Sequence, residues 1–186
     1  MCSSDLTDKF VAMRVPTADV KGTAKNYAER EKAGNAVGPL SPRDTARATV
    51  NGASIMVDYG RPSVRGRVIF GQVVPWNTVW RTGANAATQL MTSKDLMFGT
   101  TLVPAGTYSV FTLPSQEGWK LIINSQHGQW GTVYDQTKDV VRLPLDVKKL
   151  DDLVEKFTFD IASDGSRGTL RFRWEKTEAS VPFTVK

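Results

Sequence analysis

Polar and apolar residues alternate along the C-terminal third of the chain, and this alternation predicts strands. Phe157, Phe159 and Ile161 share one side of an extended chain, while Thr158 and Asp160 share the other. The same period of two recurs in two later sets: Leu170, Phe172 and Trp174, then Val181, Phe183 and Val185. This pattern is typical of antiparallel strands with one buried face and one solvent-facing face.

Turn signals divide the rest of residues 41–186 into further short strands. Asn51-Gly52 separates two apolar segments, and this dipeptide favours the positive φ angles of a type I′ hairpin. Turn residues also gather at 104–106 and at 164–166. We count about eight to ten strands and no βα alternation, which predicts an all-β fold, an antiparallel β-sandwich. A closed barrel is the structural alternative.

Two local details refine this prediction. Along one strand the apolar positions shift from Tyr108 and Val110 to Phe111 and Leu113, as a β-bulge would allow. Pro182 has no amide hydrogen to donate to a neighbouring strand, so it predicts that the last strand lies at a sheet edge.

Residues 1–40 lack the alternating pattern and are predicted to be a leader or linker that precedes the β-sandwich domain of residues 41–186. Residues 24–33 have a helix-forming composition but only Tyr27 as a sizeable apolar residue, so we expect a poorly ordered segment or a short helix. Residues 1–6 match the translation of a common sequencing-adapter string read from a GTG start codon. We interpret them as an assembly artefact that replaces the native N-terminus, where a signal peptide could have stood.

The distribution of charge along the chain argues against a nucleic-acid partner. The formal net charge of +5 is concentrated in residues 41–93, which hold six arginines, no lysine and two acidic residues. Nucleic-acid-binding proteins more often mix lysine with arginine in a continuous stripe, so we predict no nucleic-acid partner. No apolar stretch is long enough to predict a membrane span. Cys2 is the single cysteine, which excludes an intramolecular disulfide and a cysteine-based metal site.

Four polar residues in two loop-like motifs are the best candidates for ligand binding. Arg61 and Arg65 belong to the motif RPSVRGR, and Arg81 and Asn85 belong to the motif WRTGAN. Guanidinium and amide groups can jointly hold a carboxylate, a phosphate or sugar hydroxyls, and loops on a rigid sandwich commonly carry binding sites. The alternative is a polar network that ties the loops to the sheet, because buried guanidiniums and amides need partners.

A second candidate segment follows residue 124 and is rich in glycine and amides. Trp130 and Tyr134 could form an apolar wall for the ligand or a stacking platform for a sugar; the alternative is that they cover an edge of the core. Asp135 and Asp139 lack the spaced series of oxygen ligands found in a calcium loop, so we predict no metal site.

The sequence has few features of an enzyme. His127 is the only histidine, which excludes a multi-histidine metal site, and neither G-x-S-x-G nor G-x-x-x-x-G-K occurs. A hydrolase would need His127 or paired carboxylates, such as Asp58 with Asp135 or Asp139. We therefore expect a non-catalytic domain without a cofactor.

An ordered series of segments resembles one protein family. The segments are Ser41-Pro42-Arg43, DYGRPSVRGRVIFG (58–71), VWRTGANAAT (79–88), VPAGTYSVFTLP (103–114) and WEKTEASVPF (174–183). Together they are similar to the bacterial domain of unknown function family DUF2911, over nearly all of residues 41–186. Members of that family are mostly predicted exported proteins, so the resemblance implies a periplasmic or cell-surface location. The family's name assigns no activity.

The leading hypothesis is an exported β-sandwich that binds a small polar or anionic ligand, a glycan or a protein partner. A hydrolase and a purely structural envelope module are the alternatives. Binding would gain support if the candidate arginines converged on an open concavity with unpaired donors. Pairing of every donor within the protein would favour the structural role, and an isolated, exposed His127 would argue against the hydrolase.

Overall fold

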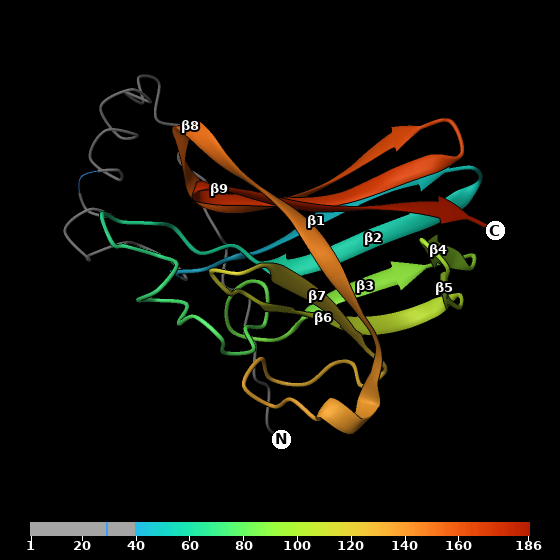
Figure 1. Ribbon diagram of the computed structural model, residues 1–186, viewed down its shortest axis with the longest axis horizontal. Helices are drawn as coiled ribbons and strands as arrows, with labels where there is room; N and C mark the ends of the chain where they lie inside the picture. Colours follow the sequence, from blue (N-terminus) through green and yellow to red (C-terminus); the bar gives the residue numbers. More distant parts are fainter. Residues whose placement is uncertain (1–28, 30–39) are drawn as a thin grey trace, which may run out of the picture. The chain divides into compact units, whose positions relative to one another are not determined.

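Nine antiparallel strands make up nearly all regular structure of residues 40–186 in the computed structural model (Figure 1). The structure describes residue 29 and residues 40–186; the rest of the predicted leader, including residues 1–6 and most of the expected helix at 24–33, lies outside this part. The strands are β1 (Arg43–Val50), β2 (Ala53–Gly60), β3 (Thr88–Thr92), β4 (Leu96–Phe98), β5 (Thr101–Val103), β6 (Gly106–Leu113), β7 (Trp119–Asn124), β8 (Asp139–Asp164) and β9 (Arg167–Val185). A short 3-10 helix, η1 (Gln136–Lys138), precedes β8. The predicted all-β antiparallel fold is confirmed.

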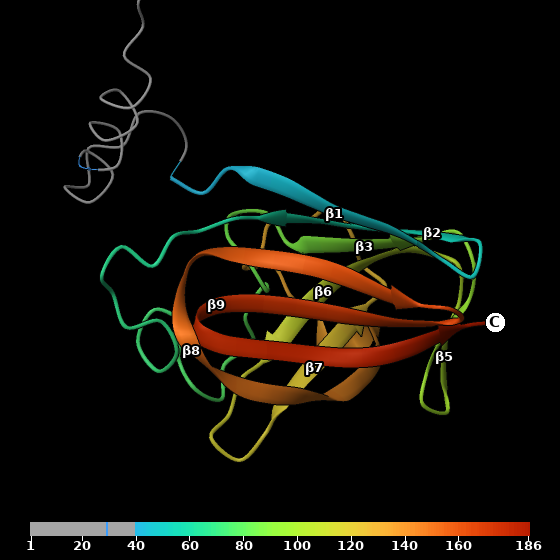
Figure 2. The ribbon, with the colours of Figure 1, turned by 90° about the horizontal axis from the view of Figure 1, so that it is seen from above.

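The strands form one continuous sheet in the order β1-β2-β3-β6-β7-β8-β9-β4-β5. Strand β8 pairs with β7 as far as Leu145 and with β9 from Asp146 onward. The long β8–β9 ribbon folds back over the other strands, so the sheet makes two layers (Figure 2). Within residues 40–186 the edge strands β1 and β5 do not pair with each other, so the sheet is open and is not a closed barrel. No helix in this part of the chain is long and apolar enough to cross a membrane.

The main core lies between these layers, and the alternating apolar residues fill it. The ring of Tyr59 in β2 packs edge-on against Phe157 and Phe159 in β8, with ring centroids 5.7 and 5.6 Å apart. The predicted hairpin turn between β1 and β2 is confirmed, because Asn51 and Gly52 have φ angles of 45° and 72°. Local turn chemistry and the two-residue period therefore account for the core together.

Strand β6 is covered on both faces, which corrects the predicted β-bulge. Its register with β3 and with β7 runs without a shift. Val110 is buried in the main core, whereas Phe111 is buried with Ala87 and Ile122 in a second cluster. Neighbouring apolar residues here mark a strand with two buried faces rather than a slipped strand.

Strand β9 is internal, which corrects the prediction that the last strand lies at an edge. The stretch that pairs with β8 ends at Ser180, and the stretch that pairs with β4 begins at Thr184. Pro182 lies between these two stretches. A proline without an amide hydrogen is tolerated there because β9 changes partner at that point.

The β8–β9 ribbon bends near Val154 and Glu175, and the bend anchors the loop that follows β2. The pairing register shifts on both sides of Val154, and Glu175 has a φ angle of 55°. Ser63 forms an isolated bridge with Lys156, and the amide of the next residue along β8 donates to the Pro62 carbonyl (2.8 Å). Two segments far apart in the sequence are therefore held together at this end of the sandwich.

Candidate ligand-binding site

The WRTGAN segment is pinned to β3 and β6 by a set of hydrogen bonds. Trp80 and Thr112 exchange backbone hydrogen bonds of 2.8 and 2.7 Å. The Thr82 and Thr112 hydroxyls lie 2.8 Å apart, and the Thr88 hydroxyl donates to the Thr82 carbonyl (2.8 Å). The Trp80 Nε1 donates to the Gly83 carbonyl (3.0 Å). These bonds satisfy polar groups that water cannot reach, so the loop has a defined shape.

Two residues of this loop have backbone φ angles in the left-handed region, which residues other than glycine seldom adopt. Thr82 has a φ angle of 49° and Asn85 has a φ angle of 64°. Asparagine tolerates this left-handed region, but a β-branched threonine does not favour it. Strain of this kind costs roughly 1–3 kcal/mol, persists only where the surrounding structure enforces it, and clusters at functional sites.

Two glycines allow the loop and its neighbours to approach closely. A Cβ atom on Gly60 would lie 2.0 Å from the Ala84 carbonyl oxygen, so β2 and the loop are in direct backbone contact. A Cβ atom on Gly131 would lie 2.0 Å from the Arg81 Cδ and 2.5 Å from the Asn85 carbonyl oxygen. The backbone of the Gly131 segment therefore lies directly on the stem of Arg81 and fixes its position.

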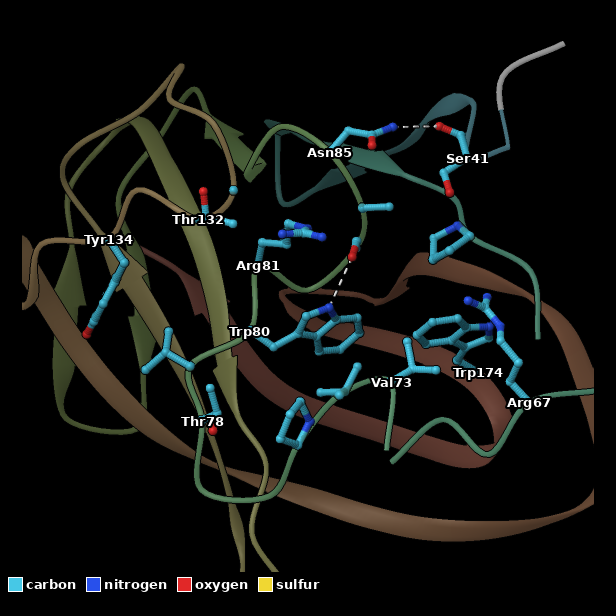
Figure 3. Close-up of a pocket in the computed structure, with 17 residues that line it drawn as sticks. Ser41, Arg67, Val73, Thr78, Trp80, Arg81, Asn85, Thr132, Tyr134 and Trp174 are labelled. Atoms are coloured by element: carbon cyan, nitrogen blue, oxygen red, sulfur yellow. Dashed lines mark hydrogen bonds between the residues drawn. The ribbon is translucent and has the colours of Figure 1, made fainter. Parts of the chain in front are cut away.

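A pocket of about 680 Å³ opens between these loops and the bend of the β8–β9 ribbon; we call it the Arg81 pocket (Figure 3). Its lining comes from the chain before β1, the two arginine motifs and their connection, the Gly131 segment and β9. The lining residues are Ser41, Pro62, Arg67, Val73, Val74, Pro75, Thr78, Val79, Trp80, Arg81, Gly83, Ala84, Asn85, Gly131, Thr132, Tyr134 and Trp174. This volume suits a small molecule.

The charge of the Arg81 pocket is positive. Two of the described residues that line it are arginines, and none is acidic. Arg67 donates through Nε to the Val64 carbonyl (3.1 Å) and through Nη2 to the Ser63 carbonyl (2.7 Å), so two of its nitrogens already have acceptors within the protein. The Nε of Arg81 is shielded from solvent and has no hydrogen-bond partner among the described residues, and no carboxylate there pairs with this side chain.

Two tryptophans form an aromatic surface of the pocket. The rings of Trp80 and Trp174 stack with centroids 5.9 Å apart and planes inclined by 16°. Trp174 is only 2% exposed, and its Nε1 is a second buried donor without a partner in the part of the chain that the structure describes. A buried donor without an acceptor costs roughly 1–3 kcal/mol, so the described residues leave the burial of both groups uncompensated.

The structure separates the predicted arginines. Arg61 does not line the Arg81 pocket, because its guanidinium donates to the Asp44 carboxylate (3.2 Å), the Phe157 carbonyl (3.2 Å) and the Thr158 hydroxyl (3.1 Å). Arg65 does not line it either, and its Nη2 donates to the Leu40 carbonyl (3.1 Å). The structure therefore does not bring these two arginines together with Arg81 in this pocket, and their ligand-binding role stays a prediction. Their partners are the protein's own acceptors.

Of the other residues predicted to bind a ligand, some line the Arg81 pocket and one does not. Asn85 lines the pocket, and its side-chain amide donates to the Ser41 carbonyl (3.3 Å). Trp130 does not line it and is 56% exposed, so its role as an apolar wall or stacking platform stays a prediction that lies outside this pocket.

Tyr134 does line the Arg81 pocket, but its hydroxyl points away from Arg81 (Figure 3). This hydroxyl donates to the Asp139 carboxylate (2.6 Å) and accepts from Arg142 (2.8 Å). Burial, the hydrogen bond and the charge of Asp139 raise the pKa of Tyr134 to about 12. The ring therefore contributes to the wall, and the hydroxyl belongs to a structural network.

The three carboxylates considered for a hydrolase are each engaged by neighbouring residues, and His127 stands apart from them in its contacts. His127 is exposed, and no hydrogen bond or ion pair joins it to the described residues. Asp58 pairs with Arg43 (2.8 Å), Asp139 pairs with Arg142 (2.8 Å), and Asp135 caps η1. Hydrogen bonds from Thr137 lower the pKa of Asp135. Residues 40–186 contain no group of three or more His, Cys, Asp or Glu side chains able to hold a metal ion.

Arg67 and Trp174 are pocket residues that the sequence analysis did not select. Arg67 was one of three arginines in its motif, and no local signal distinguishes the one that reaches the pocket. Trp174 continues the alternating apolar pattern of β9 and is indistinguishable in the sequence from a purely structural core residue. It lies beside the bend at Glu175 and reaches the pocket where its ring stacks on Trp80.

Comparison with known proteins gives one match. A family model described as protein of unknown function (DUF2911) matches residues 41–183. No curated protein and no solved structure matches the chain.

Proposed function

Since the chain belongs to the DUF2911 family, whose description assigns no activity, we propose a function from the site itself: the domain binds a small anionic ligand in the Arg81 pocket. The proposal keeps the anionic-ligand part of the sequence-based hypothesis. It assigns the contact to Arg81 rather than to the whole set of arginines.

The state of the Arg81 guanidinium carries this proposal. Its Nε is buried without a partner, in a pocket whose described lining includes no carboxylate. An arginine held in that state retains its positive charge at any physiological pH, so only an anion or another acceptor can satisfy it. A ligand oxygen that pairs with the terminal nitrogens of Arg81 would gain a hydrogen bond to a charged group, and such bonds are worth roughly 1.5–3 kcal/mol.

The construction of the loop supports the same proposal. The Gly131 backbone contacts the stem of Arg81, and buried hydrogen bonds hold Thr82 in a strained conformation. A side chain positioned before the ligand arrives loses less conformational entropy on binding, which increases affinity.

Calorimetric titration with acetate and with inorganic phosphate, at low ionic strength, tests the proposal. Arg81→Gln should weaken binding of the preferred anion at least about tenfold, because a charged hydrogen bond is lost. Arg167→Gln is the matched control: it removes the same charge from an exposed residue at the start of β9 that does not line the pocket. This control should bind within about twofold of wild type. If both substitutions weakened anion binding equally, the loss would come from the net charge of the protein rather than from Arg81, and the proposal would be overturned.

We also propose that the native protein is exported to the periplasm or cell surface. The support is the resemblance to a family whose members are mostly predicted exported proteins. Cell fractionation of the native full-length gene product tests this location, and recovery with the cytoplasmic fraction would contradict it.

A further inference from the structure

The lining of the Arg81 pocket is divided between a polar part and an apolar part. Arg81, Asn85 and Thr132 supply polar groups from two neighbouring loops. The remaining lining is dominated by aliphatic side chains, prolines and the two stacked indoles: Pro62, Val73, Val74, Pro75, Val79, Trp80 and Trp174. Of these residues, Val73, Pro75, Val79 and Trp80 are at least partly exposed, so a ligand that satisfies only Arg81 would leave their apolar surface in contact with water, at a cost that grows with the area exposed.

The donor groups indicate a single carboxylate rather than a phosphate. Sites for phosphate groups usually combine several donors, such as a series of backbone amides with a lysine or several arginines. Here Arg81 is the lining arginine whose side chain has no hydrogen-bond partner among the described residues, whereas the Nε and Nη2 of Arg67 already donate to carbonyls. One planar guanidinium matches the two oxygens of one carboxylate.

We propose that the ligand of the Arg81 pocket is a monocarboxylic acid with an apolar body. The inference rests on the proposed anion-binding function and narrows it to a chemical class. The carboxylate pairs with Arg81, and the body lies against the valine and proline side chains and the indole of Trp80.

A set of matched probes separates charge from apolar surface. 2-Naphthoate carries both features, 2-naphthamide keeps the body without the charge, and acetate and inorganic phosphate keep the charge without the body. Octanoate replaces the planar body by a flexible chain. Tryptophan fluorescence is a direct readout on the full chain, because Trp80 and Trp174 line the pocket. Calorimetry measures affinity for the non-absorbing probes.

The expected order of affinity follows from the two parts of the pocket. 2-Naphthoate should bind at least about tenfold tighter than acetate, phosphate or 2-naphthamide. Octanoate tests whether the apolar body is a flexible chain or a planar ring. Binding as tight as that of 2-naphthoate indicates a fatty acid, and weaker binding indicates an aromatic acid; both belong to the proposed class.

A pair of surface valines tests where the body lies. Val73 lines the pocket and is 43% exposed, and Val147 of β8 is 38% exposed but does not line it. Val73→Asn should weaken 2-naphthoate about three- to tenfold and leave acetate unchanged, whereas Val147→Asn should alter neither. Because both positions are already partly exposed, neither change should prevent folding.

The outcomes separate this inference from the proposed function. If acetate or phosphate binds as tightly as 2-naphthoate and Arg81→Gln weakens that binding, the apolar-acid inference fails and the anion pocket stands. If no probe binds, or if Arg81→Gln leaves every affinity unchanged, both fail.

Discussion

The two arginine motifs of this domain look alike in the sequence and behave differently in the structure. Arg61 follows the end of β2 and places its donors on acceptors of β1 and β8. Arg81 follows Trp80 and keeps a buried donor without a partner among the described residues. Both guanidiniums lie near glycines and both loops are tied to strands. The difference lies in the acceptors that surround each guanidinium.

This comparison shows how one residue type serves structure at one site and is available for binding at another. The Arg61 guanidinium lies beside the bent β8 strand, where a carbonyl and a hydroxyl face it. The Arg81 stem lies on the backbone of Gly131, in a pocket whose described lining has no carboxylate. The hydrogen bonds of Arg61 account for its position in the structure, whereas the Arg81 side chain has no hydrogen-bond partner among the described residues.

The largest effect is expected where the two motifs meet. Gly60 precedes Arg61 and contacts Ala84 of the other motif, and a Cβ atom there would lie 2.0 Å from a backbone oxygen. Gly60→Ala should force the loops apart and lower the free energy of unfolding by about 3 kcal/mol, measured by urea denaturation. Gly66→Ala is the control: Gly66 has a φ angle of 69° and a Cβ atom added there would meet nothing within 4 Å, so it should cost only about 1 kcal/mol. Equal losses would show that the contact between the motifs adds no stability.

A smaller effect should distinguish the two arginines directly. Arg61→Met removes three hydrogen bonds and leaves the Phe157 carbonyl without this donor, so it should lower the free energy of unfolding by about 1–2 kcal/mol after allowance for solvent screening. Arg81→Met removes no side-chain hydrogen bond to another described residue and should stay within about 0.5 kcal/mol of wild type. Thermal and urea unfolding of both variants measure this difference. A destabilising Arg81→Met as large as Arg61→Met would assign both motifs a structural role.

The smallest effect concerns Tyr134, which lines the pocket. Its hydroxyl, like the Arg61 guanidinium, forms hydrogen bonds to other residues of the protein. The pKa of Tyr134 is raised to about 12, chiefly by burial and by the Asp139 carboxylate. The fold therefore favours the neutral phenol, so this contribution to stability is complete below pH 10 and is lost as the pH rises from 10 towards 12. Tyr134→Phe should cost about 1 kcal/mol at neutral pH and should flatten the alkaline loss of stability. Parallel stability–pH curves for the two proteins over this range would contradict the prediction.

The sequence predicted the strands better than it predicted their surroundings. Alternation located the buried faces of β2, β8 and β9, and the Asn51-Gly52 pair located a hairpin. The errors fell on β6, which is buried on both faces, and on Pro182, where β9 changes partner. Both features depend on which strands become neighbours, and local periodicity carries no information about that.

The candidate site shows the same limit. Arg81, Asn85 and Tyr134 line the pocket as candidates chosen from the sequence, whereas Arg61, Arg65 and Trp130 do not. Arg67 and Trp174 join it without any local signal, because a bend in β9 and a turn after β2 bring them there.

By itself, the order of polar and apolar residues determined an antiparallel β fold, since side chains of an extended strand alternate between its faces wherever the strand is placed. The tertiary structure alone decided which guanidinium has partners: the acceptors of Arg61 include a carbonyl 96 residues away, and Arg81 has no comparable neighbour among the described residues. Hydrogen bonds act over about 3 Å, so the fate of a polar side chain depends on contacts that only the folded chain creates.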